Sequence, residues 1–137
     1  MTGKYAIKTR VPIVNTRNEI EATLKRYGAK NVAFMMGQAE AIVAFELVDR
    51  RVRFDIKLPD EEPKNDQLRR SLWRSLLLSI KAKLESVAAG IETFEEAFLA
   101  HVVMPGGYTV YEQIRERLTL SYVKPDKSIT LLPPPKD

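Results

Sequence analysis

The sequence predicts an α+β domain in which a small antiparallel sheet is backed by helices. Two patterns carry this prediction. Residues 50–58 alternate between apolar and charged side chains, which is the period of a β-strand with one buried face. Residues 67–89 instead repeat their apolar side chains with the period of an amphipathic helix. The expected order of elements is β-α-β-β-β, followed by a C-terminal segment of three helices that backs the sheet.

The first half of the chain is expected to supply the sheet. Residues 4–15 are predicted to be extended, with Pro12 marking an edge or an end of the strand. Residues 16–19 (Thr-Arg-Asn-Glu) have the form of a capping box, in which the hydroxyl and the carboxylate satisfy free amides at the start of a helix. They predict a helix of about three turns, and Gly28 is suited to end it.

Three further strands are predicted over residues 31–34, 41–47 and 50–58, with a turn around Asp49 before the last of them. The side chains of the last strand fall into two sets. Those expected to face the core are Val52, Phe54, Ile56 and Leu58, and those expected to face solvent are Arg51, Arg53, Asp55 and Lys57.

The second half is predicted to be helical after a polar loop at residues 59–66. The apolar face of the helix over 67–89 includes Trp73 and is interpreted as core, although a dimer seam or a docking surface for a partner helix would have the same pattern. Capping boxes that begin at Thr93 and Thr109 predict a helix over 94–102 and a last helix through Leu118. We expect one domain over residues 1–122 and an extended, proline-containing tail over 123–137.

Composition limits the function. The chain has 137 residues, a net charge of +4 and no cysteine. The length suits a single domain that buries a core. The lack of cysteine excludes disulfides, thiolate catalysis and cysteine-bound zinc. No segment has the length and apolarity of a membrane span, and the first residues lack the apolar stretch of a secretion signal. We therefore expect a soluble, cytoplasmic protein.

The residues needed for common catalytic sites are scarce. His101 is the single histidine, so a two-histidine metal centre cannot form. Its carboxylate neighbours in the sequence, Glu95 and Glu96, are explained by helix capping and by the helix dipole. We expect His101 to be structural and expect no cofactor and no metal. Whether the chain is an enzyme stays open, with a non-enzymatic role favoured.

The positively charged residues are candidates for binding phosphate groups. One set, the basic sheet face, consists of Arg51, Arg53 and Lys57, and a second set lies on the long helix at Arg70, Arg74 and Lys81. Several such contacts give salt-sensitive binding to nucleic acid that depends little on base sequence. An ordinary solvated sheet face has the same pattern, so both interpretations remain open.

Several segments carry a resemblance to a known family: residues 50–54, 74–87, 90–105 and 109–110. On these segments the chain resembles a family of uncharacterised small phage and prophage proteins, over most of residues 10–118. It departs from that family at Asp49 and Tyr111. The resemblance implies an accessory role around phage DNA metabolism in the cytoplasm of a host cell.

The first functional hypothesis is therefore a non-enzymatic phage or prophage accessory protein of DNA metabolism. It would bind nucleic acid, in single-stranded form, through the basic sheet face. The alternative is a protein–protein interaction module, an inhibitor or recruiter of a host or phage protein, that uses the helical half. A second copy of the chain is a further candidate partner, and a membrane is not expected to be one.

Overall fold

The computed structural model describes residues 2–136, with side chains from residue 11 onward. Its helices are α1 (Thr2–Arg26), α2 (Asp66–Ala88), α3 (Phe94–Phe98) and α4 (Val110–Val123), and its two short 3-10 turns are η1 (Pro63–Asn65) and η2 (Leu99–His101). Its strands are β1 (Lys30–Met36), β2 (Glu40–Leu47) and β3 (Arg50–Lys57). The predicted α+β class with a small antiparallel sheet is confirmed.

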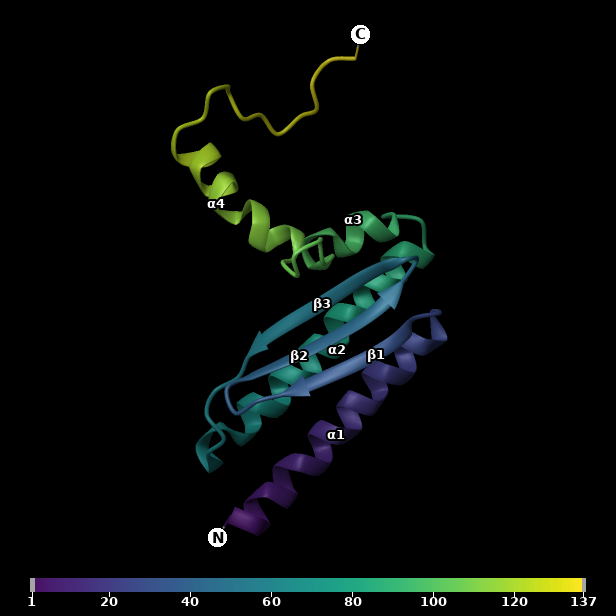
Figure 1. The fold of residues 1–137 in the computed structure, drawn as a ribbon, viewed down its shortest axis with the longest axis vertical. Helices are drawn as coiled ribbons and strands as arrows, with labels where there is room; N and C mark the ends of the chain where they lie inside the picture. The colour runs from purple at the N-terminus through teal and green to yellow at the C-terminus, as the bar shows by residue number, and fades with distance from the viewer. Residues whose placement is uncertain (1, 137) are drawn as a thin grey trace.

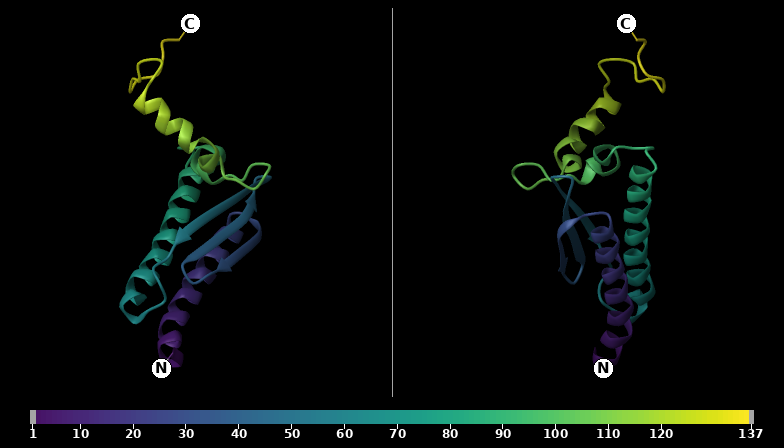
Figure 2. Two further views of the ribbon diagram at one scale, coloured as in Figure 1. Left: turned by 60° about the vertical axis from the view of Figure 1, so that its left-hand side comes forward. Right: turned by 90° about the vertical axis from the view of Figure 1, so that its right-hand side faces the viewer.

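The three strands form one antiparallel sheet in the order β1-β2-β3. Helices α1 and α2 lie against the same face of this sheet, and the opposite face is left largely open (Figures 1 and 2). Burial follows this arrangement, because Val52 and Phe54 are buried while Arg51 and Asp55, which flank them in the sequence, are exposed. The alternation predicted for β3 is confirmed.

The hairpin between β2 and β3 closes through a two-residue turn. Leu47 pairs with Arg50, and the two residues between them, Val48 and Asp49, both have positive φ angles of 50° and 57°. Two consecutive positive φ angles are the mark of a type I′ turn, which matches the twist of the flanking strands. A β-branched residue rarely adopts this conformation, so Val48 is strained.

Helix α2 supplies the centre of the core. Trp73, Leu77 and Ile80 are fully buried, and the ring of Phe34 on β1 lies 6.4 Å from that of Trp73. The interpretation of the Trp73 face as core is therefore confirmed, and this face is not a docking surface. Leu78, on the outer side of α2, is 54% exposed.

The prediction for the N-terminal segment was wrong. Residues 4–15 are not a strand but part of α1, which continues through Pro12 to Arg26. The hydroxyl of Thr16 donates to the carbonyl of Pro12 at 3.1 Å, so Thr16 lies within the helix and does not begin it. Ile13, Ile20 and Leu24 are all buried on one side of α1, and this packing outweighs the local proline signal.

The observed order is therefore α-β-β-β-α followed by two shorter helices, and the sheet is backed by α1 and α2. The helix predicted over 94–102 already ends at Phe98, because Val102 is extended and bridges to Val52 on β3. The last helix reaches Val123, beyond the predicted Leu118. It runs away from the sheet toward the C-terminal tail and does not cover the sheet (Figures 1 and 2).

Candidate interaction surfaces

The basic sheet face lies on the open side of β3, as the alternation predicts, but its charges are partly paired. Arg51 is 79% exposed and forms an ion pair with Glu46 on β2, with 3.4 Å between Nε and Oε1. Lys57 is exposed and lies opposite Glu40 across the strands. Lys57 forms no ion pair within the part of the chain that the structure describes.

Arg53, the middle residue of the basic sheet face, is largely taken up by contacts within the chain. Its Nη1 donates to the carbonyl of Gly107 at 2.7 Å, and its Nη2 donates to Glu112 at 2.8 Å. Its Nε lies 3.4 Å from the carboxylate of Asp55. The side chain is only 23% exposed. Arg53 therefore attaches the start of α4 to the sheet, a role that sequence reasoning missed because Glu112 is 59 residues away.

The second basic set does not join the first. Arg74 and Lys81 reach from α2 to the same carboxylate on α1, that of Glu19, at 3.3 and 3.7 Å. Arg70 is half-buried and forms no ion pair with a described residue. Because α2 covers the face of the sheet opposite to the basic sheet face, the two sets lie in different layers (Figure 2). A single ligand strand would have to wrap around the domain to contact both.

The carboxylates near His101 in the sequence have separate structural partners. Glu96 accepts the backbone N–H of Thr93 at 2.8 Å in a capping box, and this bond lowers the pKa of Glu96. Glu95 pairs with Arg50 at 2.9 Å. Within residues 2–136, no three His, Asp or Glu side chains are placed to hold a metal ion together.

His101 packs flat against the core. Its ring stacks on that of Phe54 with 4.0 Å between the centroids. Burial lowers the pKa of His101, and the positive charge of Lys83 adds to this effect. The structural role expected for His101 agrees with this packing.

Helix α4 begins at a capping box that is also an ion-pair site. One oxygen of Glu112 accepts both the backbone N–H of Thr109 and the guanidinium of Arg53, each at 2.8 Å. The Thr109 bonds lower the pKa of Glu112 most, and Arg53 lowers it further. The start of α4 is thus fixed to β3 by charge and hydrogen bonds.

Beyond its first turn, α4 has little contact with the domain, and none of its residues is buried. Four apolar side chains recur at helical spacing along one side, which we call the α4 stripe: Tyr111, Ile114, Leu118 and Tyr122. Their exposed fractions run from 45% to 66%. Sequence reasoning found this helix but assumed that it would cover the sheet.

No protein-family model, curated protein or solved structure matches this chain. None of the described helices combines the length and the apolar character needed to cross a membrane. The fold and the surfaces together define a small α+β domain that holds an exposed amphipathic helix at one end.

Proposed function

We propose that this protein is a protein–protein interaction module whose docking element is α4. The observation that supports this most directly is that α4 buries none of its residues while it aligns four apolar side chains on one side. A helix of 14 residues is marginally stable in water on its own, because most helical stability comes from packing an apolar face. The α4 stripe is therefore suited to be covered by a partner.

The charges beside the α4 stripe indicate which charges the partner carries beside its own apolar face. At about 100° per residue, Arg115 and Arg117 flank the stripe on its two sides, whereas Glu116 lies on the far side of the helix. Both arginines are exposed, and neither forms an ion pair with a described residue. In a pair of α4 helices these flanks would bring like charges together. The occupant proposed here is therefore an amphipathic helix of another protein with acidic flanks.

Two synthetic helical peptides with the same leucine stripe test this proposal, one with glutamates and the other with lysines at the flanking positions. In fluorescence anisotropy, the glutamate peptide is expected to bind, and more weakly as salt is added, because its flanks pair with Arg115 and Arg117. Equal binding of both peptides would contradict the charge argument. A concentration-dependent dimer in sedimentation, lost in Ile114→Ser, would assign the stripe to a second copy instead.

Nucleic-acid binding is the second candidate function, favoured by the exposure of Arg51 and Lys57 on the open sheet face. Arg51→Glu with Lys57→Glu tests it without disturbing Arg53. Oligonucleotide binding that weakens steeply with salt and is lost in this double variant would support the proposal. No binding of an oligonucleotide at low salt would contradict it. The accessory role in phage DNA metabolism rests on the family resemblance and belongs with this second candidate.

A further inference from the structure

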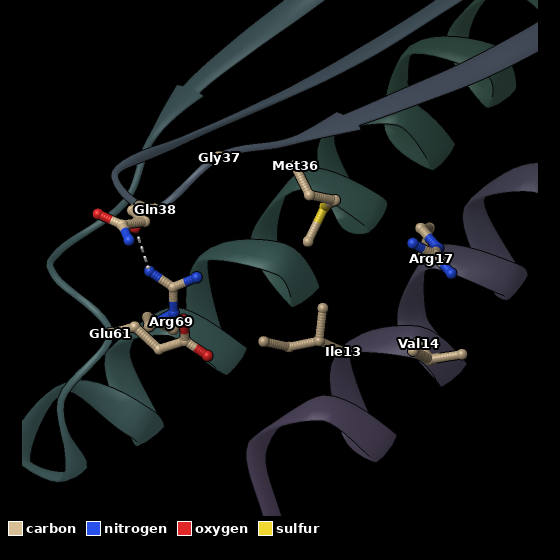
Figure 3. A pocket seen from close by; sticks show the side chains of 8 residues that line it. All are labelled: Ile13, Val14, Arg17, Met36, Gly37, Gln38, Glu61 and Arg69. Atoms are coloured by element: carbon tan, nitrogen blue, oxygen red, sulfur yellow. Dashed lines mark hydrogen bonds between the residues drawn. The ribbon is translucent and has the colours of Figure 1, made fainter. Parts of the chain in front are cut away.

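A cavity of about 510 Å³ opens between α1, the turn from β1 to β2 and the first turn of α2 (Figure 3). Its volume lies in the range of small-molecule sites. The residues that line it come from three places: Ile13, Val14 and Arg17 on α1, Met36, Gly37 and Gln38 at the turn, and Glu61 and Arg69 near the start of α2.

Arg69 is an unusual residue to find at this cavity. It is 4% exposed, and it is the one charged side chain that is buried within residues 11–136. Its Nη1 donates to the carbonyls of Gln38 and Pro59, at 3.1 and 2.6 Å. Its Nε is buried with no acceptor. In Figure 3 its other terminal nitrogen points away from Gln38, toward the side of the cavity where Met36 and Ile13 lie.

The guanidinium of Arg69 forms no ion pair with a carboxylate of any residue that the structure describes. A buried charge is costly unless it is paired, and two carbonyl oxygens compensate it only in part. An anion in the cavity would supply the missing charge and accept from the free donors.

The other lining residues indicate the chemical character of the remainder of that anion. Ile13, Val14 and Met36 form an apolar wall between Arg69 and Arg17, which lies at the far side of the cavity (Figure 3). The guanidinium of Arg17 lies 5.7 Å from the centre of the Phe34 ring, and Arg17 forms no ion pair with a described residue. Glu61 is exposed at the rim. Among the described residues that line the cavity, two cations stand against one carboxylate, an excess of one positive charge.

We propose that this cavity binds a small amphiphilic organic anion. Its carboxylate or phosphate head lies on Arg69, and its apolar body lies along Ile13 and Met36 toward Arg17. This site is separate from the α4 stripe and does not depend on the function proposed for it. Because the head accepts charge-assisted hydrogen bonds and the body is buried against apolar side chains, both parts of the ligand contribute to affinity.

Neighbouring methionines offer a matched pair of variants. Met36 lines the cavity, whereas Met35 faces the open side of the sheet and is 63% exposed. Met36→Glu places a negative charge in the cavity, and Met35→Glu places the same charge outside it. Both positions are partly exposed, so both variants are expected to fold, which thermal unfolding verifies. Arg69→Gln is less suitable, because it also removes the bonds to Gln38 and Pro59.

Calorimetric titration with octanoate at low ionic strength tests the proposal, with 1-octanol and inorganic phosphate as partial ligands. We expect saturable octanoate binding that is at least about tenfold weaker in Met36→Glu, since a like charge placed in the cavity beside the anion costs roughly that factor or more. Met35→Glu should bind like the original protein, and the two partial ligands should bind more weakly than octanoate. No saturable octanoate binding, an equal affinity for 1-octanol or for phosphate, or undiminished binding in Met36→Glu would overturn the proposal.

Discussion

The guanidinium of Arg53 on β3 donates to the carboxylate of Glu112 on α4 at 2.8 Å, and the same oxygen of Glu112 caps the first turn of that helix. One residue pair therefore both starts α4 and sets its position relative to the sheet. No residue of α4 is buried, and its first residue, Val110, also donates to the carbonyl of Val102 at 2.9 Å. The direction in which the α4 stripe is presented depends in part on the Arg53–Glu112 pair.

Removing the Arg53 side chain is expected to release α4 without unfolding the domain. In Arg53→Ala, the contacts to Glu112 and Gly107 are lost, while the buried core between α2 and the sheet is unchanged. Amide hydrogen exchange in α4 should become about tenfold faster or more, the factor expected for a lost charge-assisted hydrogen bond. Arg51→Ala, which removes a neighbouring arginine with only an exposed partner, serves as the control and should leave α4 unchanged.

Acid is expected to release α4 in the same way. The pKa of Glu112 is lowered by its bonds to Thr109 and by Arg53. A carboxyl group with a lowered pKa stabilises the folded state above its ordinary pKa, and this contribution is lost as the pH falls through the lowered value. Protection of α4 amides should therefore decrease at acidic pH. In Glu112→Gln, protection should already be low at neutral pH and should change little on acidification; a retained acid transition there would contradict the assignment.

A second pH dependence is expected from His101. Burial against Phe54 lowers its pKa, with Lys83 acting in the same direction and Asp55 opposing it. The unfolded chain then binds a proton at a higher pH than the folded one. The contribution of His101 to stability is therefore full above the ordinary histidine pKa and is lost as the pH drops from that value to the lowered pKa of the folded state. Denaturant unfolding of His101→Phe, which keeps the aromatic stack, should show a smaller loss of stability over this interval than the original protein. An unchanged loss of stability in this variant would show that groups other than His101 cause it.

The turn between β2 and β3 is a place where stability can be gained. Val48 has a φ of 50° and Asp49 a φ of 57°, angles that asparagine and glycine adopt at much lower cost. The double substitution Val48→Asn with Asp49→Gly should raise the free energy of unfolding by about 1 kcal/mol. Urea denaturation measures this change. Because Val48 is 65% exposed, loss of its side chain removes little packing that would offset the gain.

The parts of the fold that were predicted correctly depend on local patterns. The alternation in β3 and the capping boxes at Thr93 and Thr109 each involve neighbouring residues, and the structure contains all three. The N-terminal helix was missed because Pro12 and the Thr16 box are strong local signals for other structures. The packing that outweighs them, between Ile20 and the rest of the core, involves residues distant in the sequence.

The candidate surfaces also depend on contacts between residues distant in the sequence, which local patterns do not predict. Sequence spacing placed Arg51, Arg53 and Lys57 on one face, but it could not show that Arg53 is engaged by Glu112 and Gly107. A test that replaces Arg53 would therefore mix loss of a surface charge with release of α4. Likewise, no local pattern brings Arg69 to a cavity formed by α1 and the turn after β1, because that cavity exists only once three separate segments have packed together.

The central claim is that the α4 stripe docks an acidic amphipathic helix, and a pair of matched double variants tests it most directly. Ile114→Ser with Leu118→Ser removes two side chains from the stripe, and Leu120→Ser with Val123→Ser removes two similarly exposed ones from other sides of the same helix.

The measurement is the affinity of the glutamate-flanked peptide in fluorescence anisotropy. Each buried aliphatic side chain contributes about 1.5 kcal/mol or more, so the stripe variant should bind at least about a hundredfold more weakly. The control variant should bind like the original protein. Equal affinities of the two variants, or no binding of this peptide by the original protein, would contradict the proposed function.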